Sequence, residues 1–222
     1  MTAYGEQDHW GNDVSALRSN LKCSPVDRLR RAERGAKGIL NLLHAAGRCK
    51  TSEPAEFCVT LSALASAQCD FLVIGFLATS IHGGDHVPNK LQLVLEPSAV
   101  NESRFWIALE PFGPEPLGEH NKSPFLIESL RPLGDHADIW VTSLCRIALY
   151  KGLGKEPYTE LKERAIKLNL ENLTIQVVSL DDLVDAQSAS DDLKELGLAA
   201  ELDTIKRLIA EEGLGKNGPD PL

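Results

Sequence analysis

Apolar residues gather most densely between residues 70 and 96, and their spacing changes twice within this stretch. Residues 71–74 form an unbroken run of β-forming side chains, which is typical of a strand buried on both faces. Gly75 marks a sharp turn, after which residues 77–81 carry apolar side chains at helical spacing. Residues 91–95 then alternate as a second strand. A strand, glycine turn, helix and strand in this order place backbone N–H groups opposite the second strand, which is the geometry of a phosphate site.

Helical patterns precede this unit. A serine and a proline begin a predicted helix over residues 24–46, which is expected to pack on the domain through Leu29, Ile39 and Leu43. A second helix is predicted over residues 52–69, with its apolar side leading into the first strand.

The chain beyond residue 96 alternates between helical and extended patterns. The predicted elements are a helix around Phe105, a proline-rich loop at 111–123, strands at 125–130, 137–141 and 173–178, and helices at 158–168, from Ser179, and at 200–211. These patterns predict an α/β (α+β) fold in which a mixed sheet is flanked by helices. Residues 71–74, 91–95 and 137–141 are expected to be neighbouring central strands.

The same patterns divide the chain into four parts. Residues 1–23 are polar and aperiodic, so we expect a flexible N-terminal arm. Residues 24–150 form the predicted core with its N-terminal helices, and residues 151–212 form a mainly helical C-terminal lobe packed on it. Residues 213–222 are rich in glycine and proline and are expected to fray.

The balance of charge argues against a nucleic-acid partner. The 222-residue chain has a formal net charge of −9, which gives no general attraction for phosphate backbones or anionic lipids. Four arginines lie on the predicted helix at 24–46, but Asp27 and Glu33 interrupt them and no aromatic residue is interleaved. We therefore expect a solvated basic helix face that does not bind nucleic acid.

The cysteines and the apolar runs bear on the compartment. The 5 cysteines are scattered without a Cys-x-x-Cys pair, so we expect reduced thiols, with Cys58 and Cys69 as buried structural residues. The first residues lack the basic and apolar regions of a secretory signal, and no apolar run reaches the roughly 18 residues of a membrane span. We expect a cytoplasmic protein without a membrane partner.

The order of elements at residues 70–96 resembles that of the nucleotidyltransferase superfamily typified by DNA polymerase β. The similarity is greatest to its small bacterial members, which include the toxin halves of abortive-infection toxin/antitoxin pairs. In that superfamily the first strand ends in Gly-Gly or Gly-Ser, which holds a triphosphate, and the second strand carries Asp-x-Asp, which holds divalent metal. The resemblance implies that Gly75, Phe76 and Ser80 are the nucleotide-binding positions.

The sequence departs from this pattern where the chemistry takes place. Phe76 stands at the second glycine position, and Lys90 and Gln92 stand at the two aspartate positions. Asp138 matches the third carboxylate, but Mg²⁺ takes carboxylate oxygens and rejects ammonium groups, so one ligand is too few. Asp138 is then either a vestigial ligand or a strand-end acid paired with Lys90. The Phe76 ring either blocks a phosphate or turns into the core.

The resemblance also implies phosphate-contacting cations near the C-terminal end. By counting, those positions hold Gln187, Asp192, Lys194 and Glu195. Two of the positions at which the resemblance implies cations therefore hold neutral or acidic residues, and the triphosphate side of the site is weakened as well.

Two functional hypotheses follow. The favoured one is a catalytically degenerate nucleotidyltransferase-fold protein without a cofactor, which binds a protein partner or a small molecule in a regulatory role. The alternative is an active, Mg²⁺-dependent nucleotidyltransferase that transfers a nucleotide to RNA or protein with rearranged ligands, namely Asp85, Asp138 and Glu96. An active site requires at least two carboxylates to converge beside Gly75 within roughly 4 Å of one point.

Overall fold

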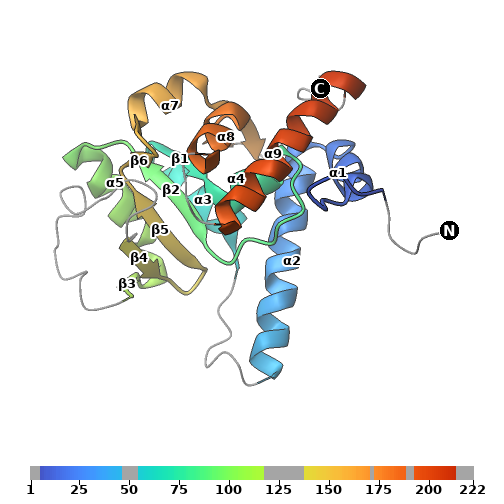
Figure 1. The fold of residues 1–222 in the computed structure, drawn as a ribbon. Coiled ribbons are helices and arrows are strands. Elements are labelled where there is room, and N and C mark those ends of the chain that lie inside the picture. Colours follow the sequence, from blue (N-terminus) through green and yellow to red (C-terminus); the bar gives the residue numbers. More distant parts are fainter. Residues whose placement is uncertain (1–5, 47–54, 118–137, 171–172, 189–192, 214–222) are drawn as a thin grey trace.

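A computed structural model describes residues 6–46, 55–117, 138–170, 173–188 and 193–213. Within these residues, seven strands form one mixed sheet in the order β3-β4-β5-β2-β1-β9-β8, and a separate two-stranded ribbon joins β6 and β7. Helices surround the sheet (Figure 1). The predicted α/β class, with a mixed sheet flanked by helices, is confirmed.

The elements have the following bounds. The helices are α1 (Val14–Leu21), α2 (Pro25–Ala45), α3 (Phe57–Ser66), α4 (Gly75–His82), α5 (Ala99–Leu109), the short 3-10 helix η1 (Glu110–Phe112), α7 (Tyr158–Arg164), α8 (Leu180–Ser188) and α9 (Leu193–Glu212). The strands are β1 (Phe71–Ile74), β2 (Leu91–Leu95), β3 (Glu115–Pro116), β4 (Asp138–Val141), β5 (Arg146–Tyr150), β6 (Gly152–Leu153), β7 (Glu156–Pro157), β8 (Ile166–Leu170) and β9 (Leu173–Val177).

The centre of the sheet is the unit that the apolar pattern predicts. β1 ends where α4 begins at Gly75, and β2 returns antiparallel to β1, with Phe71 opposite Leu95 and Ile74 opposite Gln92. On the outer sides, β5 runs parallel to β2 and β9 runs parallel to β1. Both β1 and β2 are buried along their whole length, which explains their nearly continuous apolar character.

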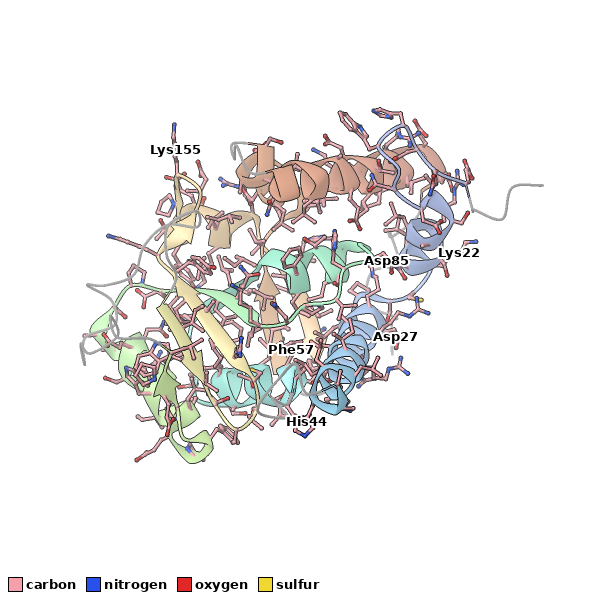
Figure 2. The ribbon with its side chains drawn as sticks, turned by 60° about the horizontal axis from the view of Figure 1, so that its bottom comes forward. Lys22, Asp27, His44, Phe57, Asp85 and Lys155 are labelled. Atoms are coloured by element: carbon pink, nitrogen blue, oxygen red, sulfur yellow. The ribbon has the colours of Figure 1, made fainter. Side chains whose placement is uncertain are left out.

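The helices form a layer on each face of the sheet. α3 packs against α5 and β9, whereas α4 packs against α8, which in turn packs against α9. Figure 2 shows the sheet between α9 on one side and α3, marked by Phe57, on the other. The long helix α2 contacts α3, α4 and β8, and so closes the β8 edge of the sheet.

One central strand, β5, has no counterpart in the sequence-based prediction. It lies between β2 and β4, so the three strands predicted as neighbours share one sheet, but β4 pairs with β5 instead of β2. The turn that joins β4 to β5 lacks glycine and proline. The Thr142 hydroxyl instead accepts the N–H groups of Leu144 and Cys145, at 3.1 and 3.0 Å. A threonine closes this turn, and such turns carry a faint sequence signal.

The segment after residue 150, which is predicted to be mainly helical, contributes β8 and β9 to the same sheet. The predicted helix at 158–168 is wrong beyond Arg164. Ile166, Leu168 and Leu170 alternate with exposed Lys167 and Asn169, and this period of two pairs the segment with β9. The predicted strand at 173–178 is confirmed.

The predicted flexible arm contains a packed helix. Asp13 caps α1, with its carboxylate accepting the Ala16 N–H at 3.0 Å, and Leu17 and Leu21 are buried. The helix packs against α9, and Arg18 Nε donates to the Glu212 carboxylate at 2.7 Å. Residues 14–21 are therefore part of the folded body, because α9 provides an apolar surface that the local sequence does not reveal.

The predicted helix at 24–46 is confirmed, but its apolar contacts are partly wrong. Leu29 and Ala36 are buried, whereas Ile39 is 46% exposed and Leu43 is 36% exposed. The second half of α2 extends past the edge of the sheet in Figure 1. Helical spacing identifies one face of a helix, but it does not tell how far the body beneath that face extends.

Two of the remaining predictions are partly wrong: the helix predicted at 52–69 spans Phe57–Ser66, and the loop predicted at 111–123 contains the end of η1 and the short strand β3. The helices around Phe105, from Ser179 and at 200–211 are confirmed, although the last begins earlier, at Leu193. The predicted strand at 125–130 lies outside the described residues. Among the helices that the structure describes, none combines the length and the apolar character that crossing a bilayer requires.

Asn101 of α5 ties the outer ends of β1 and β2 together. Its Oδ1 accepts the Asp70 N–H at 2.6 Å, and its Nδ2 donates to the carbonyl oxygens of Asp70 and Glu96 at 2.8 and 3.0 Å. The Asn101 side chain is 2% exposed, so its polar atoms depend on these three hydrogen bonds. One buried amide therefore bridges the start of β1 and the end of β2.

We predict that Asn101→Ala lowers the free energy of unfolding by about 2–3 kcal/mol, because it removes the three hydrogen bonds of a buried amide. Urea denaturation followed by circular dichroism measures this change. Val100→Ala on the same helix is the control, since Val100 is 64% exposed, and its effect should stay within about 0.5 kcal/mol. Equal losses for the two variants would contradict the role of the Asn101 amide.

Candidate functional site

The turn at Gly75 is covered by the Gln92 side chain. Gly75 has a φ of +65°, a conformation that favours glycine. A Cβ atom built on Gly75 would lie 2.1 Å from Gln92 Oε1 and 2.5 Å from Gln92 Cδ. Gln92 is 8% exposed, and its Nε2 donates to the Tyr150 hydroxyl at 3.3 Å. The Gln92 carboxamide therefore occupies the space beside the Gly75 Cα atom.

The end of β2 next to this turn carries positive charge. Lys90 is half-buried and directly precedes Leu91, which pairs with Ile147, the residue that follows Arg146 on β5. Burial and the neighbouring Arg146 guanidinium lower the pKa of Lys90. Two cationic residues thus stand at the strand end where the resemblance implies metal ligands, and like charges repel a divalent cation.

Asp138 is separated from these positions by a whole strand. It pairs with Leu149 of β5, which pairs with Leu93 of β2, whereas Gln92 pairs with Ala148. Adjacent register rows belong to opposite faces of a sheet. The backbone register therefore assigns Asp138 and Gln92 to opposite faces, on strands about 10 Å apart.

Glu96 lies at the far end of β2. It is four residues from Gln92, or about 13 Å along an extended strand. Its carboxylate accepts the Ser98 hydroxyl, and its backbone N–H donates to the Asp70 carbonyl at 3.1 Å. The structure places Glu96 beside the start of β1 and away from Gly75.

Phe76 and Ser80 line one side of α4 instead of a cleft at its start. Phe76 is 38% exposed, and its ring packs against the His86 ring with centroids 5.3 Å apart, so the ring does not enter the core. Ser80 Oγ lies 2.9 Å from the Phe76 carbonyl oxygen and 2.8 Å from that of His86. The Ser80 hydroxyl is therefore engaged by backbone carbonyls and ties the loop after α4 to the helix.

Asp85 and His86 gather around Glu201, a residue that the sequence analysis did not single out. Glu201 is 6% exposed, accepts the Asp85 N–H at 2.7 Å and forms an ion pair with His86. This carboxylate raises the pKa of His86. The signal in the sequence is an acid on the face of α9 that also carries buried Leu198 and Leu202. Asp85 lies beyond the C-terminal end of α4, whereas Gly75 is its first residue.

Of the four positions where the resemblance implies phosphate contacts, three belong to described helices. Gln187 on α8 is 5% exposed, while Lys194 and Glu195 belong to the first turn of α9 and Asp192 lies outside the described residues. Within the described ranges, no three His, Cys, Asp or Glu residues gather closely enough to hold a metal ion.

Of the two thiols predicted to be buried, Cys69 is buried and Cys58 is partly exposed. Burial raises the pKa of Cys58 and of Cys69 to about 12, and it does the same for Cys145. These thiols are protonated at neutral pH and are therefore poor nucleophiles.

His82 closes α4 and is a packed residue, as its position at the end of an apolar helix indicates. Its Nε2 lies 2.8 Å from the Val178 carbonyl oxygen, so a neutral ring donates a hydrogen bond there. Burial lowers the pKa of His82 to about 4. The histidine links α4 to the end of β9.

No protein family model matches the sequence, and no curated protein matches it. The structure is similar to the crystal structure of an antigenic nucleotidyltransferase-like protein from Paracoccidioides brasiliensis, with a TM-score of 0.45 and 12% sequence identity over 69% of this chain and 75% of that chain. A TM-score below 0.5 at this identity assigns neither an activity nor a family to this chain.

We predict strong coupling between Gly75 and Gln92. Gly75→Ala is expected to destabilise the protein by about 2–4 kcal/mol, because the positive φ and the contact with Gln92 both oppose a methyl group. In a Gln92→Ala background the steric part is absent, and only about 1 kcal/mol of backbone strain should remain. A double-mutant cycle by chemical denaturation measures this difference. Additive effects would show that Gln92 does not fill the space beside Gly75.

A second prediction concerns acid stability. An unfolded histidine takes up a proton near its ordinary pKa of 6.5, whereas buried His82 does so only near pH 4. Below pH 6.5 the unfolded state therefore binds more protons than the folded state, and this residue makes the stability fall as the pH falls through this range. His86 acts in the opposite direction, since its raised pKa contributes stability that is lost as the pH rises. His82→Gln should reduce the stability lost between about pH 7 and pH 4.5 by about 2 kcal/mol. Exposed His9→Gln is the control and should leave the pH dependence unchanged.

Proposed function

We propose that this chain is a non-catalytic binding protein built on a nucleotidyltransferase-like arrangement of strand, glycine turn and helix. The position of Gln92 carries this proposal. A phosphate group approaches a glycine turn through the space that a side chain would otherwise fill. Here that space is taken by a buried carboxamide, which is itself hydrogen-bonded to Tyr150.

The surrounding charges support the same proposal. Transfer of a nucleotide uses divalent cations held by converging carboxylates. Lys90 and Arg146 place positive charge at the relevant strand end. Asp138 belongs to the register row of Leu93, and Glu96 stands at the other end of β2.

The binding surface then lies outside the glycine turn. A groove of about 700 Å³ runs between α2 and α3, with Arg30, Arg34, Val59 and Ser62 among its lining residues. Its volume is in the range of small-molecule sites. We propose a small molecule or a protein segment as the ligand of a regulatory protein that acts in the cytoplasm.

The test restores the missing carboxylates. We expect the unmodified protein to show neither Mg²⁺-dependent binding of nucleoside triphosphates by calorimetry nor transfer of a labelled nucleotide to RNA or protein. Lys90→Asp combined with Gln92→Asp uncovers Gly75 and makes the strand end more negative by about three charges, so this variant should gain weak, roughly millimolar Mg²⁺ binding. Adding Phe76→Gly should improve access for the phosphates.

A matched control lies on the neighbouring hairpin. Lys167 pairs directly with Gln176 on β8 and β9, so Lys167→Asp with Gln176→Asp makes the same charge change at another cross-strand position. This control should not gain Mg²⁺ binding. Mg²⁺-dependent transfer by the unmodified protein, lost in Asp85→Asn or Asp138→Asn, would overturn the proposal in favour of an enzyme with rearranged ligands.

A further inference from the structure

A small pocket lies at the C-terminal end of α4, at the opposite end of this helix from Gly75. Its volume is about 130 Å³, and it is enclosed by α2, the end of α1 and the loop that follows Gly84. Figure 2 shows Asp85 of this loop between α9 and α2, whose first turn is marked by Asp27. Arg28, Arg31 and Ser80 are among the lining residues.

Arg28 is a buried cation whose Nε atom lacks an acceptor among the described residues. Its side chain is 6% exposed, and its Nε atom has no hydrogen-bond partner in the part of the chain that the structure describes. Burial lowers the pKa of Arg28 to about 10, so the guanidinium stays charged at neutral pH. Burying a charge without a partner costs several kcal/mol. Such a residue is costly to maintain unless something else compensates its charge.

Arg31 is held at the same pocket by a buried amide. Its Nη1 donates to Asn20 Oδ1 at 2.7 Å, and Asn20 Nδ2 donates to the Gly84 carbonyl oxygen at 3.3 Å. Arg28 and Arg31 are three residues apart and so lie on the same face of α2. Ala32 and Gly35 continue this face with almost no side chain, which leaves the space in front of the arginines open.

The acidic groups near the pocket do not cancel this charge. The Glu201 carboxylate is already engaged, since it forms an ion pair with His86 and accepts the Asp85 N–H. Asp85 lines the pocket, but it is exposed to solvent. The two arginines therefore leave an excess of one positive charge over Asp85.

We infer that this pocket binds a compact oxyanion, either free phosphate or sulfate or the phosphate group of a larger molecule, through Arg28 and Arg31. The guanidinium fork matches the oxygens of such groups and forms strong, charge-assisted hydrogen bonds with them. A space of this size equals about four water molecules, which admits one oxyanion group but not a whole nucleotide. The inference does not depend on whether the Gly75 turn is catalytic.

Thermal unfolding in phosphate or sulfate, compared with chloride at equal ionic strength, tests this site. At about ten times the dissociation constant, the oxyanion should raise the Tm by about 3–5 °C. Arg28→Met should abolish this shift and, without oxyanion, should raise the Tm above that of the unmodified protein, because an unpaired buried charge is removed. An arginine with a purely structural role would give a lower Tm instead.

Matched variants separate the site from general electrostatics. Arg207→Gln removes an equal charge from an exposed position on α9 and should keep the full shift. Arg31→Gln should weaken binding about tenfold by calorimetry without a change in fold. Asp85→Asn should strengthen it.

Thermal unfolding with two phosphate compounds distinguishes a free oxyanion from a phosphorylated ligand. Equal shifts with inorganic phosphate and glycerol phosphate support recognition of the phosphate group alone, and a larger shift with the ester supports a phosphorylated ligand. Equal shifts in chloride and phosphate, or a shift that persists in both Arg28→Met and Arg31→Gln, would overturn the inference.

Discussion

The Gln92 side chain lies against the Gly75 Cα atom in the middle of the sheet, and the pairing of β1 with β2 holds both residues there. Two features depend on this contact. Gly75 must remain a glycine, because a Cβ atom there would meet the carboxamide, and the carboxamide makes its hydrogen bond to Tyr150 in a buried position. The glycine turn is therefore a packed part of the core.

The two ends of α4 have different environments as a result. At its start, the backbone faces a neutral carboxamide. At its end, the chain passes Gly83 and Gly84 into a loop that Ser80, His86 and Glu201 hold in place, next to an arginine pair on α2. The helix is 8 residues long, so the two environments are about 12 Å apart. The arginine pair therefore lies at the opposite end of α4 from the Gly75 turn.

The sequence predicted the parts of this fold in which neighbouring residues alone indicate the burial or the hydrogen bonding of a side chain. β1 and β2 are apolar along their length because both faces are buried, and the Ser24 and Ser179 caps place α2 and α8 correctly. β5 was missed because Thr142 closes the preceding turn without glycine or proline. The site residues contact partners that are distant in the sequence, and such contacts leave no local pattern. Glu201, for example, is more than a hundred positions from Asp85. Likewise, nothing in the spacing of residues along α2 distinguishes buried Arg28 from exposed Arg30.

The contact between α1 and α9 has a consequence for how the chain is made. The first helix of the described residues packs against the last, through Arg18 with Glu212 and through the Asp8 carboxylate, which accepts the Thr204 hydroxyl at 2.7 Å. Figure 1 shows these two helices side by side. During synthesis, α1 leaves the ribosome before α9 has been made. The contacts of Arg18 with Glu212 and of Asp8 with Thr204 therefore form only after α9 has emerged, which makes the docking of these segments a late step of folding.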